Sequence, residues 1–159
     1  MNTVYNNIKT LLDQNHIQYE EFDHAPILSY EDAEREKARL GWTGIESKNV
    51  FMKGNDDQYY IYVTTQGEKV DFKKLKELLG VKLSIASGDD VKTVAECVPG
   101  CVSPFGFSEK IIILIDPKIY THTHYLFSPG ITTKTILLNI QTLAPIFNTL
   151  PNKVITLTE

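Results

Sequence analysis

Helix-like and strand-like segments alternate along the whole chain, in an order that fits neither a regular βαβ series nor an all-β protein. Apolar residues recur at helical spacing in some segments, such as Val4, Ile8 and Leu12, and form short strand-like runs in others. Predicted helices lie at about 4–15, 31–40, 72–79, 91–97 and 140–147, the last interrupted near Pro145, with caps expected from Ser29, Asp71, and Ser87 or Asp89. Predicted strands lie at about 49–53, 58–65, 82–86, 110–116, 125–128, 135–139 and 154–157, with an extended segment at 17–23. The sequence therefore predicts an α+β fold with a mixed sheet.

The length and composition fit one soluble domain. A chain of 159 residues suits one well-formed core and is too short for two ordinary domains, so residues 1–159 are predicted to form a single domain. Hydrophobic residues make up 42% of the chain, and the longest apolar run, 111–115, is far too short to cross a bilayer. The segment 1–7 has no charged and apolar signal pattern, which favours a cytoplasmic location. Cys97 and Cys101 fit neither a disulfide framework nor a zinc site, and no cofactor is expected.

A turn-rich segment from Pro99 to Gly106 precedes the strand-like run at 111–116. Glycine lets backbone approach a ligand closely and proline removes one donor, so the remaining N–H groups between Gly100 and Pro104 can point together at a negatively charged oxygen. Two glycines and two prolines in eight residues are also typical of an ordinary surface turn. The segment alone does not decide between an oxyanion-binding loop and a surface turn.

The context of this loop is a series of motifs that begins with Lys48, at the start of a short apolar strand. After it come, in order, the tyrosine-rich strand at 59–63, Val70-Asp71-Phe72-Lys73-Lys74-Leu75 leading to Leu79-Gly80, Lys82-Leu83-Ser84-Ile85-Ala86-Ser87, and the loop Gly100 to Pro104. This series resembles the YbaK/prolyl-tRNA editing domain family over about 11–143, which is more specific than any one motif. The resemblance implies a curved, barrel-like mixed sheet with helices packed around its outside.

The resemblance also implies an activity: hydrolysis, in trans, of the ester of a mischarged tRNA that carries a small amino acid such as alanine or cysteine, with tRNA for proline as the leading acceptor. An aminoacyl ester is already activated, so aligning a water and stabilising the oxyanion can suffice. A hydroxyl of the terminal adenosine would help to activate the water, so no metal is required. The implied catalytic residues are Lys48, which would hold the terminal phosphate or the aminoacyl end, and Gly100, Cys101, Val102, Ser103 and Pro104, the loop that presents backbone N–H groups.

Three residues are implied to bind the substrate: His24, in the segment His24-Ala25-Pro26, and Ser128 and Thr132. Without the resemblance, His24 reads as an ordinary residue at a strand end. The alanine-specific branch has histidine and asparagine where this chain has Ser128 and Thr132, and the glycine-containing turn of the cysteine-specific branch is partly matched by Pro129-Gly130. The sequence therefore leaves the identity of the amino acid open.

Three other features bear on a metal site, a serine hydrolase and nucleic-acid binding. His122 and His124 would share one side of a strand, as metal ligands do, but no third ligand stands at a convincing spacing. Ser103 lacks the glycine-flanked elbow of a serine hydrolase. A net charge of −4 argues against tight nonspecific nucleic-acid binding, so neither DNA nor a membrane is an expected partner. The expected partners are the acceptor end of mischarged tRNA and prolyl-tRNA synthetase, and the alternative to an enzyme is a non-catalytic module of the same fold that binds one of them.

Overall fold

The computed structural model describes residues 3–158; Met1, Asn2 and Glu159, which the domain prediction includes, lie outside the described residues. Its helices are α1 (Thr3–Gln14), α2 (Tyr30–Leu40), α3 (Phe72–Leu79), α4 (Gly88–Thr93) and α5 (Leu143–Thr149), with 3₁₀ turns η1 (Pro117–Thr121) and η2 (Ile140–Thr142). The strands are β1 (Tyr19–Asp23), β2 (Ile45–Gly54), β3 (Tyr59–Thr65), β4 (Leu83–Ile85), β5 (Ile112–Ile115), β6 (His124–Phe127), β7 (Lys134–Asn139) and β8 (Val154–Thr156).

Local capping explains where the middle helices begin and end. The side chain of Ser29 accepts the Asp32 N–H at the start of α2, and α2 ends at Gly41, whose φ of 68° is left-handed. Asp71 and Gly80 bound α3 in the same way. Helix α4 starts directly after its cap Ser87 and ends at Thr93, so the prediction of a helix at 91–97 was placed too late.

The C-terminal helix prediction was also wrong in detail. Pro145 does not interrupt a helix that begins at residue 140. The short turn η2 comes first, and Pro145 lies in the first turn of α5, where its missing N–H has no helical acceptor to lose.

The strands form one mixed sheet in the order β1-β7-β6-β2-β3-β5-β8, with β4 also paired to β2. Neighbouring strands are parallel in the pairs β2–β6, β3–β5 and β5–β8 and antiparallel in the others. The α+β prediction is confirmed. The barrel-like expectation needs a correction, because β1 and β8 stand at opposite ends of the order and the sheet of the described chain stays open.

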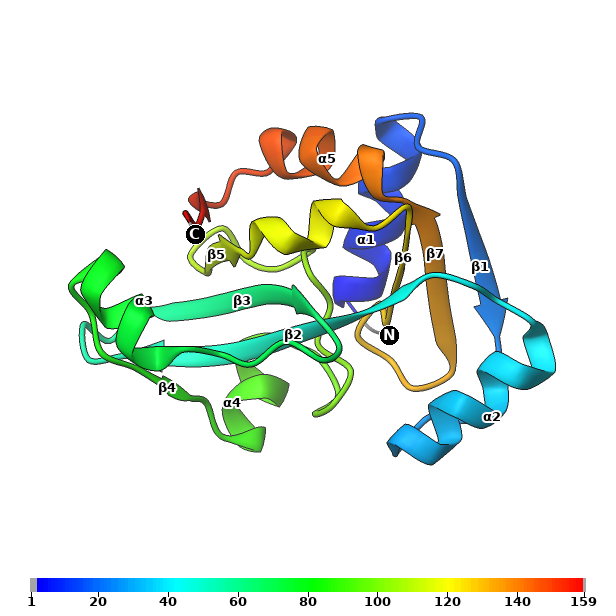
Figure 1. The fold of residues 1–159 in the computed structure, drawn as a ribbon, viewed down its shortest axis with the longest axis horizontal. Coiled ribbons are helices and arrows are strands. Elements are labelled where there is room, and N and C mark those ends of the chain that lie inside the picture. Colours follow the sequence, from blue (N-terminus) through cyan, green and yellow to red (C-terminus); the bar gives the residue numbers. More distant parts are fainter. Residues whose placement is uncertain (1–2, 159) are drawn as a thin grey trace.

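Strand β2 joins the two halves of the molecule (Figure 1). One edge pairs with β3 from Ser47 to Lys53. The other edge pairs with β6 only at Ile45 and Glu46, and with β4 only from Met52. The sheet therefore splits between β6 and β4, and the middle of β2 is left for other contacts.

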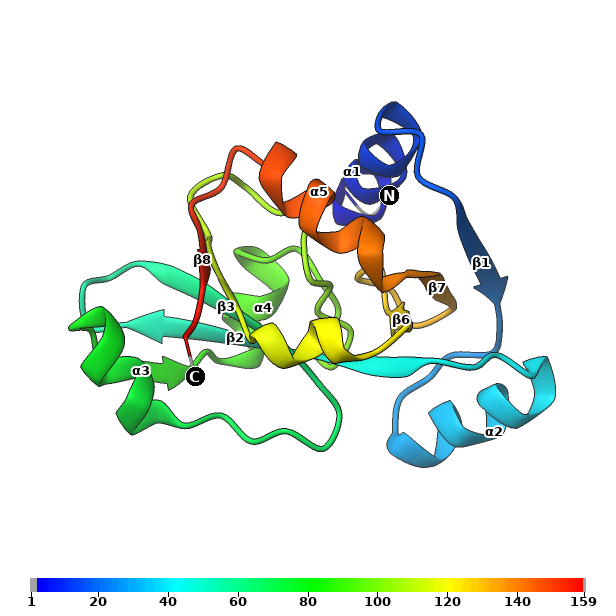
Figure 2. The same cartoon turned by 45° about the horizontal axis from the view of Figure 1, so that its top comes forward.

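The helices cover the sheet at separate places. Helices α1 and α5 lie close together on one side, and their apolar residues, among them Ile8, Leu12 and Ile146, join the largest core cluster (Figure 2). Helices α3 and α4 lie by the β3–β4 half, and α2 lies beyond β1 and β7 (Figure 1). Within residues 3–158, no helix combines the length and apolar character needed to cross a membrane.

Candidate active site

A cavity of about 290 Å³ lies where the sheet splits. Its walls come from the middle of β2, the segment after α4, the β6–β7 turn, and the chain on either side of α2. All of the site residues expected from the sequence line it except Ser103 and Pro104; those that do are His24, Lys48, Gly100, Cys101, Val102, Ser128 and Thr132.

Lys48 lies within β2, three residues after its start, and not at the beginning of a strand as predicted. The strand is longer than its apolar pattern because Ile45 and Glu46 pair with β6. The side chain is half-buried, and its Nζ donates a hydrogen bond of 2.8 Å to the carbonyl oxygen of Glu68. The Lys48 ammonium group is therefore held at the cavity wall.

The loop from Gly100 to Pro104 presents fewer free donors than expected. Gly100 has a φ of 89°, and the Cys101 N–H donates to the Val98 carbonyl at 2.8 Å, so it is not free to bind an oxyanion. The N–H groups of Gly100 and Val102 have no acceptor among residues 3–158. The Val102 carbonyl accepts the Asn49 Nδ2 at 3.0 Å, which fastens the loop to β2.

Ser103 and Pro104 do not line the cavity. Ser103 is fully buried and its hydroxyl donates to the Phe105 carbonyl at 2.6 Å, so it stabilises the turn and is not placed to attack a substrate. Burial raises the pKa of the Cys101 thiol, against the smaller opposing effect of the Ser128 hydroxyl. A thiol with a raised pKa is a poor nucleophile at neutral pH.

His24 is held by both ring nitrogens. Its Nδ1 lies 2.9 Å from the Ala25 carbonyl, which can only accept, and its Nε2 lies 2.8 Å from the Thr135 hydroxyl. Hydrogen-bond chemistry therefore assigns the proton to Nδ1, with the Thr135 hydroxyl able to donate to Nε2. With both ring nitrogens engaged, His24 is not placed as a general base.

The β6–β7 turn brings Ser128 and Thr132 into the wall, as expected. The Ser128 hydroxyl donates to the Ile131 carbonyl at 3.0 Å, and Gly130 takes a φ of 92° in this turn. The Gly130 carbonyl accepts the Val98 N–H at 3.1 Å, so this turn and the loop at 98–104 support each other.

The sequence did not indicate several residues that line the cavity, above all Trp42, Glu46 and Asn49. Trp42 follows directly after Gly41, which ends α2. That it is the only tryptophan of the chain is the one feature of the sequence that could have drawn attention to it. Burial raises the pKa of the Glu46 carboxyl, although the Lys37 ammonium, 3.9 Å away, acts in the opposite direction.

The candidate metal ligands are not brought together. His122 caps the end of η1 and His124 begins β6, so only the second lies in a strand. Within the described chain, no group of three or more His, Cys, Asp or Glu side chains is arranged to hold a metal ion.

The cavity brings together the Lys48 ammonium, the unpaired N–H groups of Gly100 and Val102, and the fixed ring of His24. It contains no paired nucleophile and base. Such a site can bind and polarise an ester. This is the kind of site expected of an aminoacyl-tRNA editing domain. The model of that family matches residues 24–146, and the chain belongs to the aminoacyl-tRNA editing domain family. It is thus an aminoacyl-tRNA deacylase, and the resemblance stated from the sequence is confirmed.

Two relatives give the range of this similarity. The chain is 28% identical over 141 residues to the prolyl-tRNA editing protein ProX of Acetoanaerobium sticklandii, covering 85% of each protein. It is 27% identical over 90 residues to the multifunctional Ser/Thr-tRNA deacylase ProXp-y of Escherichia coli K12, covering 55% of this chain and 54% of that protein. A crystal structure of a candidate trans-editing enzyme for prolyl tRNA synthetase has a TM-score of 0.74 at 16% identity, covering 100% of this chain and 99% of that one, which supports the fold alone.

Proposed function

We propose that this protein, as one domain acting in trans, removes a small amino acid such as alanine or cysteine from mischarged tRNA, with tRNA for proline as the leading acceptor. The observation that carries the proposal is the meeting of Lys48 with the unpaired N–H groups of Gly100 and Val102 in a cavity of about 290 Å³. The name of the ProX relative supports the choice of acceptor, and the small cavity supports the choice of a small amino acid.

The reaction proposed is direct attack of water on the ester carbonyl. The C–O bond to the ribose then breaks, and the proton lost by the water is taken up by the departing ribose oxygen. The N–H groups of Gly100 and Val102 would bind the oxyanion, and losing one such donor typically costs about 100- to 1,000-fold in rate. The Lys48 ammonium would hold the aminoacyl end or the terminal phosphate.

The proposal needs no covalent intermediate. Ser103 is buried in its own turn, and the Cys101 thiol has a raised pKa. Both ring nitrogens of His24 are engaged, so a hydroxyl of the terminal adenosine remains the group proposed to activate the water. This substrate-assisted route requires neither a metal nor a cofactor.

The partners proposed are the acceptor end of mischarged tRNA and prolyl-tRNA synthetase, and the proposed location is the cytoplasm. A binding module of the same fold is the second candidate, favoured only by the engaged Cys101 N–H, which leaves fewer free donors than an ideal loop.

Deacylation of a panel of mischarged tRNAs separates the two candidates. The panel contains alanine, cysteine and serine on tRNA for proline, together with alanine on its cognate tRNA as a control. The proposal expects release of the small amino acids from tRNA for proline faster than from the control. Binding of the same tRNAs without release would establish the binding module instead.

A further inference from the structure

Two of the most exposed apolar side chains among the described residues stand beside the active-site cavity. Leu28 is 76% exposed and Tyr30 is 68% exposed, and both lie where the chain enters α2. Ile27, directly before them, lines the cavity, and so does Ala33, the fourth residue of α2. A single exposed apolar residue needs no explanation, but a pair beside a cavity points to a molecule that the cavity binds.

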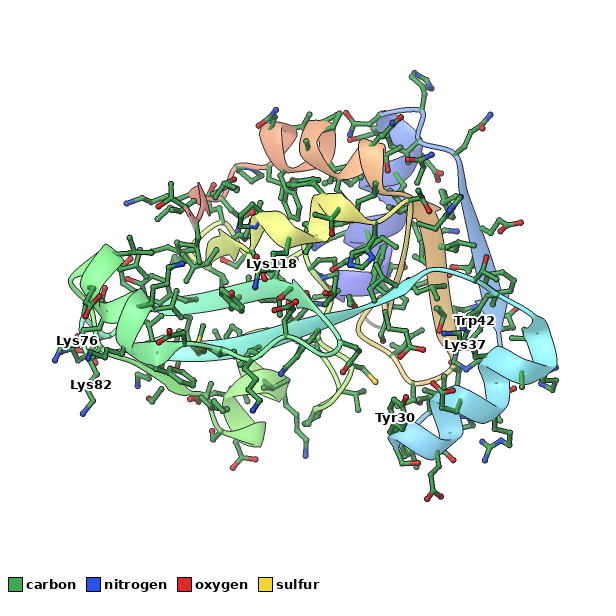
Figure 3. The ribbon with its side chains drawn as sticks, in the orientation of Figure 1. Tyr30, Lys37, Trp42, Lys76, Lys82 and Lys118 are labelled. Atoms are coloured by element: carbon green, nitrogen blue, oxygen red, sulfur yellow. The ribbon has the colours of Figure 1, made fainter. Side chains whose placement is uncertain are left out.

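The helical spacing turns Tyr30 toward the cavity. Tyr30 and Ala33 are three residues apart in α2, so they share one face of the helix. Lys37, one turn further along this face, approaches the Glu46 carboxylate of the cavity wall at 3.9 Å. Figure 3 labels Tyr30 and Lys37 on the side of α2 that faces β7. The Tyr30 side chain therefore lies at the edge of the cavity and extends its wall outward.

The segment between β1 and α2 holds this edge in place. The Ile27 N–H donates to the Thr132 carbonyl at 2.9 Å, which ties the segment to the β6–β7 turn. The Ala25 N–H donates to the buried Glu36 carboxylate at 3.0 Å, which ties it to α2. Tyr30 thus stands on a backbone that is fixed from two sides, and little order has to be gained when a ligand binds.

The surroundings of Tyr30 suit an uncharged flat ring and not a phosphate group. Glu31 and Asp32 follow it in the first turn of α2. The carboxylate of Glu34, and to a smaller extent that of Glu46, raises the pKa of the Tyr30 hydroxyl. These carboxylates repel a phosphate, whereas a nucleic-acid base is uncharged at neutral pH and stacks on aromatic side chains. A cavity of about 290 Å³ is small for a ligand site, so it can hold the aminoacyl group while the base lies at its edge.

We propose that the ring of Tyr30 stacks on the terminal adenine of the tRNA while the cavity holds the aminoacyl group, with Leu28 completing the apolar surface under the base. Stacking of one base on an aromatic side chain typically changes binding by about 5- to 150-fold. The inference rests on the proposed deacylase function and adds to it a residue that binds the substrate away from the ester.

The first test measures KM and kcat for release of alanine from tRNA for proline. Tyr30→Ala should raise KM by about tenfold and leave kcat within about twofold, because stacking away from the ester is equal in the ground state and the transition state. Tyr30→Phe keeps the ring and should keep the wild-type KM. Ile85→Ala, which removes an apolar side chain of the same exposed fraction, 68%, from β4, is the matched control with wild-type values. A Tyr30→Phe protein that behaves like Tyr30→Ala would assign the effect to the hydroxyl and overturn the inference.

The second test identifies the base with two small esters. The alanyl ester of adenosine carries the terminal base alone, and alanine methyl ester carries no base. Tyr30→Ala should lower kcat/KM by about tenfold for the adenosine ester and leave it unchanged for the methyl ester. A loss on tRNA alone would assign Tyr30 to another nucleotide, and an equal loss on the methyl ester would assign it to the reacting end. Either result overturns the inference.

The third test measures binding without hydrolysis, so that it separates this inference from the proposed function. Calorimetry is carried out with adenosine to which alanine is joined by an amide in place of the ester. Tyr30→Ala should bind this compound about tenfold more weakly than the wild type and Tyr30→Phe do. Equal affinities of the three proteins overturn the inference. Absence of release from every tRNA in the panel by the wild type overturns the proposed function itself, and the affinities still decide the role of Tyr30.

Discussion

Buried polar groups are treated differently in the active-site cavity and in the β3–β5–β8 half of the sheet. Far from the cavity they are matched: the Thr64 hydroxyl donates to Asp116 at 2.8 Å, and the Asn152 Nδ2 donates to the Ser108 and Ile111 carbonyls at 2.9 and 2.8 Å. In the cavity wall, Trp42 and Asn49 each keep an unmatched atom.

This difference separates stability from function. A matched buried group contributes to the free energy of unfolding, and its removal leaves a partner unpaired. An unmatched group lowers stability in the free protein and gains its partner from a bound water or a ligand. Substitutions in the two regions should therefore have opposite signatures: a loss of unfolding free energy in the β3–β5–β8 half, and a loss of activity in the cavity wall.

Lys48→Met should have the largest effect on activity, a loss of at least about 100-fold in deacylation rate, because it removes the only cationic group proposed to touch the reacting end. It also removes the bond to the Glu68 carbonyl, so unfolding should become easier by about 1–2 kcal/mol. Rates are measured on alanylated tRNA for proline, and stability by urea denaturation. Lys53→Met, on the same strand but outside the cavity, is the control with nearly full activity. A fully active Lys48→Met protein would refute the assigned role.

Asn49→Ala and Asn152→Ala form the sharpest pair. Asn152→Ala removes both bonds and leaves the Ile111 carbonyl without this donor, while the Ser108 carbonyl keeps the Ile111 N–H; it should lower the unfolding free energy by about 1–3 kcal/mol with little change in the rate of the folded enzyme. Asn49→Ala releases the Val102 carbonyl and the loop it fixes, so deacylation should fall by about tenfold or more with a smaller loss of stability. Urea denaturation and single-turnover rates are compared for both. If both variants lose the same unfolding free energy and keep equal deacylation rates, the division between a region that serves stability and a region that serves activity is wrong.

Ser128→His changes the cavity wall without touching Lys48 or the loop donors. The wild type should remove alanine, cysteine and serine at rates within about two orders of magnitude of each other, since a difference of one small group in a pocket is worth about 1–3 kcal/mol. The larger imidazole of Ser128→His should narrow the range of amino acids that are removed and favour alanine. The relative deacylation rates of the three substrates measure this change in specificity. Two results would mean that Ser128 does not contact the amino acid: a wild type strictly specific for alanine, or a set of relative rates that Ser128→His leaves unchanged.

Local signals explain how much of the fold could be predicted. The caps Ser29 and Asp71 and the stop residues Gly41 and Gly80 act through contacts within a few residues, so α2 and α3 were placed well. Strand β2 was predicted too short, because Ile45 is the only apolar residue among its first four and the pairing of Ile45 and Glu46 with β6 joins segments that are distant in sequence.

The site was predictable to the same extent. Residues that belong to a motif, such as Lys48 and His24, were found, and the structure brings them to one cavity. Trp42 and Glu46 were missed because only tertiary packing brings them there. The engagement of the Cys101 N–H was not predictable either, since it depends on the path of the backbone from Val98.

Acid should loosen α2 through Glu36, a buried carboxylate that accepts the Arg39 Nε at 2.5 Å and the Ala25 N–H at 3.0 Å. The bond from Arg39 is the main cause that holds the pKa of Glu36 below its ordinary value of 4.5, against the effect of burial. A lowered pKa gives stability that is present above 4.5 and is lost as the pH falls through the folded-state value. Unfolding curves are measured at about pH 3 to about pH 7. The free energy of unfolding should fall less steeply with decreasing pH for Glu36→Gln than for the wild type. Parallel curves would show that other carboxylates account for the loss.

Cys101→Ala should have the smallest effect, because the proposed reaction uses neither the backbone N–H nor the thiol of Cys101, although this residue lines the cavity. Its N–H is bonded to the Val98 carbonyl and alanine preserves that bond, while burial raises the pKa of its thiol and so keeps it protonated at neutral pH. Deacylation should stay within about threefold of the wild type, which corresponds to about 0.7 kcal/mol in the activation barrier. Prolonged chelation should leave the wild-type rate equally unaffected. A large loss in Cys101→Ala would restore a thiol to the mechanism, and a loss on chelation alone would point to a metal held by residues such as His122 and His124, in conflict with the substrate-assisted route.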